Sequence, residues 1–134
     1  MTASRFKDVM TNGRGGSTSK TAESYMIELA IEKVTGKSLP FFESESMKHG
    51  TETEPQARAM YELLSGNEVS EVAFIEHNEF IGVSPDGLIG NDGLLEIKCP
   101  NTKTQVERFL SGVGLPVDYK WQVHGQIWVA EREW

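Results

Sequence analysis

The chain has 134 residues with a net charge of −7, and 38% of its residues are hydrophobic while 25% are charged. This size and composition are typical of one soluble globular domain, and no apolar run approaches the ~18 residues that a membrane-spanning helix needs. The N-terminal stretch lacks the apolar core of a signal peptide, and a single cysteine excludes an internal disulfide. We therefore expect a cytoplasmic protein with no membrane contact.

The acidic charge is concentrated in the middle of the chain. The net charge is +2 over residues 1–37, −9 over residues 38–100 and zero over residues 101–134. Most of these acids are expected on a solvated surface. The alternative is a cluster of carboxylates gathered for a divalent cation, which brings its own positive charge.

Two helices are predicted in the first half of the chain. The first runs over about residues 20–35 and stops at Gly36, and the second runs over residues 51–65, with Pro55 in its first turn, and stops at Gly66. Apolar residues at helical spacing predict the buried face of each helix. These residues are Tyr25, Met26, Leu29, Ile31 and Val34 in the first helix and Ala57, Met60, Tyr61 and Leu64 in the second.

From Val69 onward the hydrophobic period changes to two, which predicts strands. Strands are expected within residues 68–77 and 79–85, followed by a tight turn at 90–93 and a third strand over about 94–99. Residues 101–112 read as a helix capped by Asn101 or Thr102, and residues 118–134 as mostly helix. The pattern predicts one α/β domain of α+β character, in which helices flank an antiparallel three-strand meander.

Three charged residues, Asp86, Glu96 and Lys98, stand inside the stretch that reads as a hairpin. Side chains alternate along a strand, so Glu96 and Lys98 share a face, and the hairpin folds Asp86 back beside Glu96. One interpretation is a cross-strand salt bridge. The other is a Mg²⁺ site, because Mg²⁺ takes one or two carboxylates and completes its shell with water and substrate phosphate. Lys98 would then stabilise charge during phosphodiester hydrolysis.

The same residues resemble the motif of the PD-(D/E)XK nuclease superfamily, with Pro85-Asp86 as the first half and Glu96-Ile97-Lys98 as the second. The longer string "SPDGL", a short turn and then "LEIKCP" resembles the phage lambda exonuclease (YqaJ-type viral recombinase) family, which resects linear duplex DNA from 5′ ends. The resemblance implies a restriction-endonuclease-like core with a central mixed β-sheet. It also implies Asp86, Glu96 and Lys98 as catalytic residues, and Asp86, Glu96 and the Ile97 carbonyl as ligands of Mg²⁺, with Mn²⁺ as the alternative metal.

Three further stretches are similar to motifs of that family. "MTAS" resembles a segment that holds the 5′ phosphate, which implies Ser4 and Ser84 as phosphate-site residues. "GTETEPQAR" resembles a helix whose glutamate stands beside the metal, which implies Glu54, directly or through water. An exposed acid in the first turn of a helix is the plainer alternative for Glu54. "WQVHGQIW" resembles a Q-x-Q-x-x-x-W helix, in which Gln122 matches the first glutamine and His124 takes the place of the second, a phosphate-site residue.

The resemblance extends over residues 1–134 and is cut at both ends. The family pattern has a tryptophan and a phosphate-binding arginine upstream of "TAS", and it continues past "QIWV". Arg5 and Arg14 are the candidates for the place of that arginine. Arg14 also lies in a basic, glycine-rich loop, residues 13–20, that can contact the DNA backbone or stay an unoccupied surface loop.

Other site types are disfavoured. The glycine-rich loop lacks the G-K-[ST] order of an ATP-binding loop, and one cysteine cannot hold an iron–sulfur cluster. Cys99 should face away from Lys98 as a small buried hydrophobe. His49 and His77 have no second ligand at metal spacing and are expected to be structural or exposed.

The motifs together predict a Mg²⁺-dependent 5′-to-3′ exonuclease that acts on double-stranded DNA ends in phage-type recombination. A non-catalytic DNA-binding or assembly module on the same fold and an endonuclease of the same superfamily are the alternatives. The resemblance also implies a ring of three subunits, a single-strand annealing protein as partner, and a phage-infected or prophage-carrying bacterial host.

Overall fold

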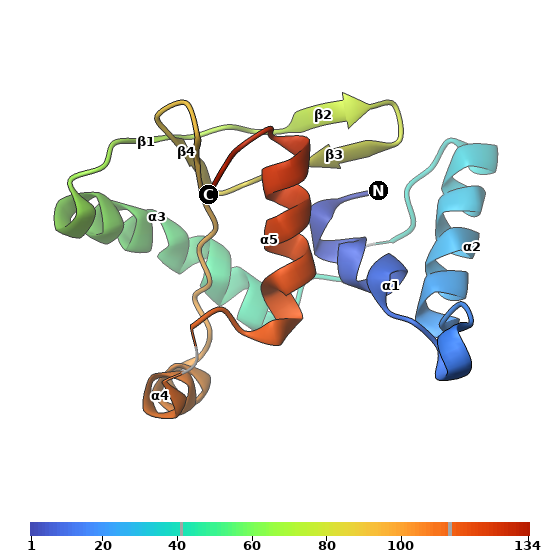
Figure 1. Ribbon diagram of the computed structural model, residues 1–134, viewed down its shortest axis with the longest axis horizontal. Coiled ribbons are helices and arrows are strands. Elements are labelled where there is room, and N and C mark those ends of the chain that lie inside the picture. Colours follow the sequence, from blue (N-terminus) through green and yellow to red (C-terminus); the bar gives the residue numbers. More distant parts are fainter. Residues whose placement is uncertain (41, 113) are drawn as a thin grey trace.

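The computed structural model describes residues 1–40, 42–112 and 114–134. Its elements follow the order η1 Ala3–Arg5, α1 Phe6–Met10, η2 Arg14–Gly16, α2 Lys20–Thr35, α3 Glu45–Ser65, β1 Val69–Ser70, β2 Ile75–Asn78, β3 Ile81–Val83, β4 Gly87–Ile89, β5 Gly93–Leu95, α4 Thr102–Ser111 and α5 Val117–Val129. Helix α5 runs through the middle of the molecule, with α1 and then α2 on one side and the β4 strand on the other (Figure 1).

Capping residues set the ends of the predicted helices α2 and α4. The Ser19 side chain accepts a hydrogen bond from the Ala22 N–H at the start of α2, and Asn101 accepts one from the Thr104 N–H at the start of α4. Helix α2 ends at Gly36, whose φ of 65° is left-handed backbone that glycine adopts without strain. These helices, and the predicted C-terminal helix α5, are confirmed.

Helix α3 begins earlier than predicted. It starts at Glu45 rather than near Thr51, because the Ser44 side chain accepts from the Met47 N–H and caps an additional turn and a half. Pro55 therefore lies inside the helix and not in its first turn. A proline at this position removes one backbone hydrogen bond of the helix.

The predicted buried faces of α2 and α3 are confirmed at Tyr25, but most of the other apolar residues expected inside are exposed. Tyr25 and Ala22 are the buried residues of α2, and none of the α3 residues is buried. Several of the apolar residues expected inside are well exposed; they include Met26, Ile31, Val34, Met60 and Leu64. Helical spacing identified an apolar stripe on each helix, but the described residues do not cover it.

The strands form two small antiparallel sheets in the described part of the chain, not one mixed sheet with a three-strand meander. One sheet has the order β1-β4-β5 and the other pairs β2 with β3. The chain changes sheets at Ser84-Pro85-Asp86, because proline has no N–H to continue a ladder. Among residues 1–40, 42–112 and 114–134, the parallel contact is one bridge between Thr2 and Gly82.

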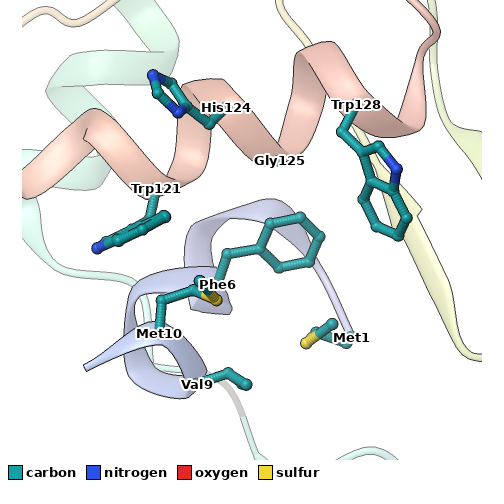
Figure 2. Close-up of a pocket in the computed structure, with 8 residues that line it drawn as sticks. All are labelled: Met1, Phe6, Val9, Met10, Trp121, His124, Gly125 and Trp128. Atoms are coloured by element: carbon teal, nitrogen blue, oxygen red, sulfur yellow. The ribbon is translucent and has the colours of Figure 1, made fainter. Parts of the chain in front are cut away.

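The core joins the N-terminal helices, β3 and α5. Ala3, Phe6, Val83 and Val129 are buried together. Helix α5 approaches α1 closely at Gly125, where an added Cβ would lie 1.7 Å from Cδ2 of Phe6. Beside this contact lies a cavity of about 280 Å³ with mainly apolar walls (Figure 2). Its lining residues are Met1, Phe6, Val9, Met10, Trp121, His124, Gly125 and Trp128.

Among the described residues, no helix is both long and apolar enough to cross a bilayer.

Candidate active site

The β4–β5 hairpin brings Asp86 and Glu96 together at its open end. Gly87 pairs with Leu95, and the Asp86 N–H donates to the Leu95 carbonyl at 3.1 Å. Glu96 is the next residue, so the two acids lie directly opposite each other. The predicted convergence of these carboxylates is confirmed.

The predicted third strand is shorter than expected, because β5 ends at Leu95 and not at Cys99. Beyond that point, the Ile97 N–H donates to Oδ2 of Asp86 at 2.5 Å, where a strand would donate to a backbone carbonyl. A carboxylate thus replaces the ladder partner. This bond fixes the Glu96-Ile97-Lys98 segment directly against Asp86.

Glu96 is held by three side chains. Oε1 accepts from Lys98 Nζ in an ion pair and from Gln122 Nε2 at 2.6 Å. Oε2 accepts from Gln126 Nε2 at 2.6 Å. The Glu96 side chain is only 8% exposed and that of Lys98 is 34% exposed, so the pair lies at the boundary between the interior and solvent. The salt bridge that the sequence offered as one interpretation was a cross-strand pair, whereas Lys98 pairs with Glu96 two residues away in the same segment. This pair agrees with the shared face predicted for the two side chains.

Burial and nearby negative charge act on Asp86. Burial first, and then the charge of Glu96, raises the pKa of Asp86 to about 6, and the charge of Glu54 adds to the effect. The Ile97 N–H and the Lys98 ammonium act in the opposite direction. Burial and the neighbouring acids together therefore disfavour the ionised form of Asp86.

Glu54 of α3 contributes to this negative field. Its carboxylate pairs with Arg58 at 2.7 Å, and Arg58 also pairs with Glu71 at 2.5 Å. Arg58 is 12% exposed, so it anchors α3 to the segment that follows β1. Glu54 is thus a half-buried, paired acid near Asp86 rather than the freely exposed first-turn acid that was the alternative.

We tested whether these residues fit a divalent cation. In residues 1–40, 42–112 and 114–134, no group of three or more His, Cys, Asp or Glu is arranged to hold a metal ion. Mg²⁺ needs only one or two carboxylates, however. Each carboxylate oxygen can accept two hydrogen bonds, and among the described residues Oε2 of Glu96 accepts one. Asp86 and Glu96 therefore fit a two-carboxylate site, and a cation there would offset the mutual repulsion of these acids.

The two serines predicted at the phosphate site lie on different elements. Ser84 is exposed beside Asp86, and its carbonyl lies 3.4 Å from Gln126 Nε2. Ser4 is exposed in η1, where its Oγ lies 3.4 Å from that of Thr2. The geometry brings Ser84 to the carboxylates and gives Ser4 no hydrogen bond to them in the described part of the chain. Their binding roles stay predictions.

Of the polar residues predicted on α5, Gln122 contacts Glu96 and His124 does not. His124 is exposed and its ring lies 6.4 Å from that of Trp121. Figure 2 shows His124 on the edge of α5 away from Phe6. A step of two residues turns a helix by about 200°, so His124 and Gln122 project in different directions.

Arg14 lies in η2, and its carbonyl accepts from Ser17 Oγ at 3.1 Å. The loop separates α1 from α2, and Figure 1 places it on the side of the molecule away from β4. The structure does not bring Arg14 to the carboxylates within the described contacts, and its proposed contact with DNA stays a prediction.

Cys99, His77 and His49 are the residues for which the sequence predicted no catalytic or metal-binding role. Burial, together with the charges of Glu54 and Asp86, raises the pKa of the half-buried Cys99 thiol, which keeps it protonated and weakly nucleophilic. His77 packs against Trp128 with ring centroids 4.6 Å apart, and His49 lies 3.5 Å from the Thr53 hydroxyl.

Gln126 is the site residue that the sequence did not reveal. It is fully buried, and its amide spans Glu96 and the Ser84 carbonyl. The usable signal was its spacing of four residues from Gln122, which places both amides on one face of α5.

With this geometry established, comparisons with known proteins identify the family. The family model described as the YqaJ-like viral recombinase domain matches residues 1–133. The chain belongs to that family. The motif around Asp86 and Glu96 predicted membership of this family, and the prediction is confirmed. A comparison with curated proteins gave no match.

Solved structures support the assignment to the YqaJ-like family. The alkaline exonuclease LHK-Exo from Laribacter hongkongensis is 40% identical, with a TM-score of 0.85 over 100% of this chain and 65% of that one. The same enzyme in complex with dAMP matches with a TM-score of 0.84 at 40% identity. A phage-related exonuclease from Haemophilus somnus 129PT, at 19% identity and a TM-score of 0.71, shares the fold over 98% of this chain and 63% of its own. This chain thus spans about two thirds of the length of these exonucleases.

Proposed function

We propose that this chain is a Mg²⁺-dependent DNA nuclease that removes nucleotides from linear duplex DNA in the 5′-to-3′ direction during phage-type recombination. The observation that carries the proposal is the meeting of Asp86 and Glu96 at the open end of the β4–β5 hairpin, with Lys98 paired to Glu96. The 40% identity to an alkaline exonuclease, one structure of which holds dAMP, supports a nuclease with a DNA substrate.

Asp86 and Glu96 would hold the metal, with the Ile97 carbonyl and Glu54, directly or through water, as further predicted ligands; the charge of Glu54 acts on Asp86. A bound divalent cation would polarise the scissile phosphate and lower the pKa of a water molecule. Asp86 must be ionised to serve as a ligand, and its pKa of about 6 requires a pH above that value in the absence of metal. Mn²⁺ is the alternative ion, since its preferred ligands are also oxygens.

Lys98 has the position of a charge-stabilising group. Its ammonium pairs with Glu96 and is one third exposed, so it can donate a hydrogen bond to a phosphate oxygen that gains charge in the transition state. Gln122 and Gln126 fix the Glu96 carboxylate from the other side. The chain thus holds the Glu96 carboxylate from two sides and keeps the paired Lys98 ammonium partly exposed to a substrate.

The substrate form tests the proposal. Linear 5′-phosphorylated duplex, linear 5′-hydroxyl duplex and closed circular DNA are incubated with the protein in Mg²⁺ or in EDTA. We expect degradation of linear but not circular DNA, with loss of activity in EDTA. Cutting of the circle would replace the proposal with an endonuclease, and binding without cutting of any substrate would replace it with a non-catalytic DNA-binding module.

We also propose three features that a role in recombination implies. The chain would work beside a single-strand annealing protein, form a ring of subunits around the DNA and act in the bacterial cytoplasm. The family resemblance supports each of them.

A further inference from the structure

A groove of about 360 Å³ opens beside Glu96 and Lys98. It is bounded by these residues, by the C-terminal half of α4 and by the start of α5. On α5 its lining residues, Tyr119 and Val123, lie on roughly the opposite face from Trp121, Gly125 and Trp128, which line the apolar cavity of Figure 2. The groove, rather than that cavity, therefore adjoins the carboxylates.

Tyr119 holds two cations at this groove. Arg108 Nη2 donates to the Tyr119 hydroxyl at 3.0 Å, and its guanidinium carbon lies 5.1 Å from the ring centroid. The Lys98 ammonium lies 5.2 Å from the same centroid. Both positive groups therefore lie near the same ring and line the same groove, so an anion that enters the groove would be attracted by both.

The other arginines are committed elsewhere or lie away from the groove. Arg5 pairs with both Asp8 and Glu28, and Arg58 pairs with both Glu54 and Glu71. Arg132 donates to the Gly90 carbonyl, and Arg14 lies in η2.

Arg108, by contrast, lines the groove with Glu96 and Lys98 and forms no ion pair within the described residues. It is half-buried and oriented by a hydroxyl rather than neutralised by a carboxylate.

We propose that Arg108 binds a backbone phosphate of the DNA strand next to the phosphate that is hydrolysed, with Tyr119 orienting its guanidinium. A guanidinium has five N–H donors in a planar fork, so the donors that Tyr119 does not use can bind a phosphate through two parallel hydrogen bonds. The exposed Phe109 and Leu115 side chains beside it offer an apolar wall for a sugar or base. This inference rests on the proposed nuclease function.

The test measures DNA binding without cleavage. Fluorescence anisotropy with a labelled linear 5′-phosphorylated duplex, in Ca²⁺ in place of Mg²⁺ and with the DNA checked for integrity afterwards, gives the affinity between 50 and 200 mM salt. The variant is Arg108→Gln. The matched control is Lys103→Gln, which removes the same charge from an exposed side chain of the same helix outside the groove.

Loss of one phosphate contact should lower the slope of log affinity against log salt by about 0.9 for duplex or about 0.7 for a single strand. We expect that change in Arg108→Gln, with an affinity about 10-fold lower at low salt. Lys103→Gln should keep the wild-type slope. Arg108→Lys should restore the slope, because it keeps the charge, but recover only part of the affinity, because it lacks the planar fork. Tyr119→Phe should weaken binding less than Arg108→Gln.

A wild-type slope in Arg108→Gln would overturn the inference, as would an equal loss in Lys103→Gln or a failure of Arg108→Lys to restore the slope. If wild-type protein binds and degrades linear DNA while Arg108→Gln binds like wild type, the inference about Arg108 fails and the proposed nuclease function stands. When wild-type protein neither binds nor degrades it, the proposed nuclease function fails as well.

Discussion

Gln126 donates a hydrogen bond from Nε2 to Oε2 of Glu96 at 2.6 Å, and the same nitrogen lies 3.4 Å from the Ser84 carbonyl. A single buried amide on α5 therefore contacts both the Ser84-Pro85-Asp86 connection between β3 and β4 and Glu96, the residue that follows β5. Because Gln126 is fully buried, its position is set by packing, and it sets the position of Glu96 in turn.

Replacing this amide by a carboxylate should expose its role. Gln126→Glu puts a second acid against Glu96 in the interior, so we expect the free energy of unfolding to fall by about 2–4 kcal/mol at pH 8. The deficit should shrink toward pH 5 as the two acids share a proton. Urea denaturation at both pH values measures it. Gln56→Glu, at an exposed position of α3, is the control, and equal stability of the two variants at pH 8 would contradict the account.

Ionisation of Asp86 should lower the stability of the metal-free protein at neutral pH. Its folded-state pKa of about 6 lies above the ordinary value of 3.8. The contribution of the protonated carboxyl to stability is therefore fully present below pH 3.8 and is lost as the pH rises through 6. Asp86→Asn cannot ionise but keeps an acceptor for the Ile97 N–H. In EDTA we expect it to exceed wild type by about 1–2 kcal/mol at pH 8, after allowance for solvent screening, relative to their difference at pH 4. Thermal or urea unfolding at the two pH values measures this change, and a constant difference would contradict it.

Two helical glycines should respond in opposite ways to replacement by alanine, because one lies in a tight contact between α5 and α1 and the other lies in open space on α3. In Gly125→Ala the new methyl group would overlap the ring of the buried Phe6, and we expect a loss of about 1–3 kcal/mol that outweighs the helix-propensity gain of about 1 kcal/mol. Gly50 lies inside α3 with nothing within 4 Å of an added Cβ, so Gly50→Ala should gain stability. Denaturant unfolding measures both changes, and a stabilising Gly125→Ala would refute the packing described for Phe6.

Two ion pairs of α3 should differ in their contribution to stability. Arg58 is 12% exposed and bridges Glu54 and Glu71, so Arg58→Gln should cost about 1–3 kcal/mol by leaving a half-buried acid without its partner. Lys48 pairs with Glu45 on the surface, and Lys48→Gln should change stability by less than about 0.5 kcal/mol. Equal effects of the two substitutions on the thermal midpoint would contradict this ranking.

Local features of the fold were predictable because their causes are local. The caps Ser19 and Asn101 and the left-handed Gly36 each act within a few residues, so α2 and α4 could be placed from the sequence. The turn at Gly90 likewise identified the β4–β5 hairpin, and with it the meeting of Asp86 and Glu96.

Features that depend on distant contacts were not predictable. The pairing of β1 with β4 skips the β2–β3 hairpin, so nothing near Val69 in the sequence indicates its partner Ile89. The role of Gln126 depends on how α5 packs across the hairpin, and its spacing from Gln122 indicates a shared helix face but not the carboxylate that this face contacts. The early start of α3 at Glu45 was missed because Pro55 reads as a first-turn residue until the cap at Ser44 is seen.

The most direct test of the proposed chemistry is the rate at which nucleotides are released from linear 5′-phosphorylated duplex in Mg²⁺. Wild type is compared with Lys98→Ala and with Lys103→Ala, which removes an exposed lysine of α4 that lies outside the carboxylate site. We expect wild type and Lys103→Ala to release nucleotides at equal rates, EDTA to abolish release, and Lys98→Ala to be slower by about 10²–10³-fold. Release by Lys98→Ala at the wild-type rate, or release that persists in EDTA, would contradict the assignment of Asp86, Glu96 and Lys98 as a metal-dependent reaction centre.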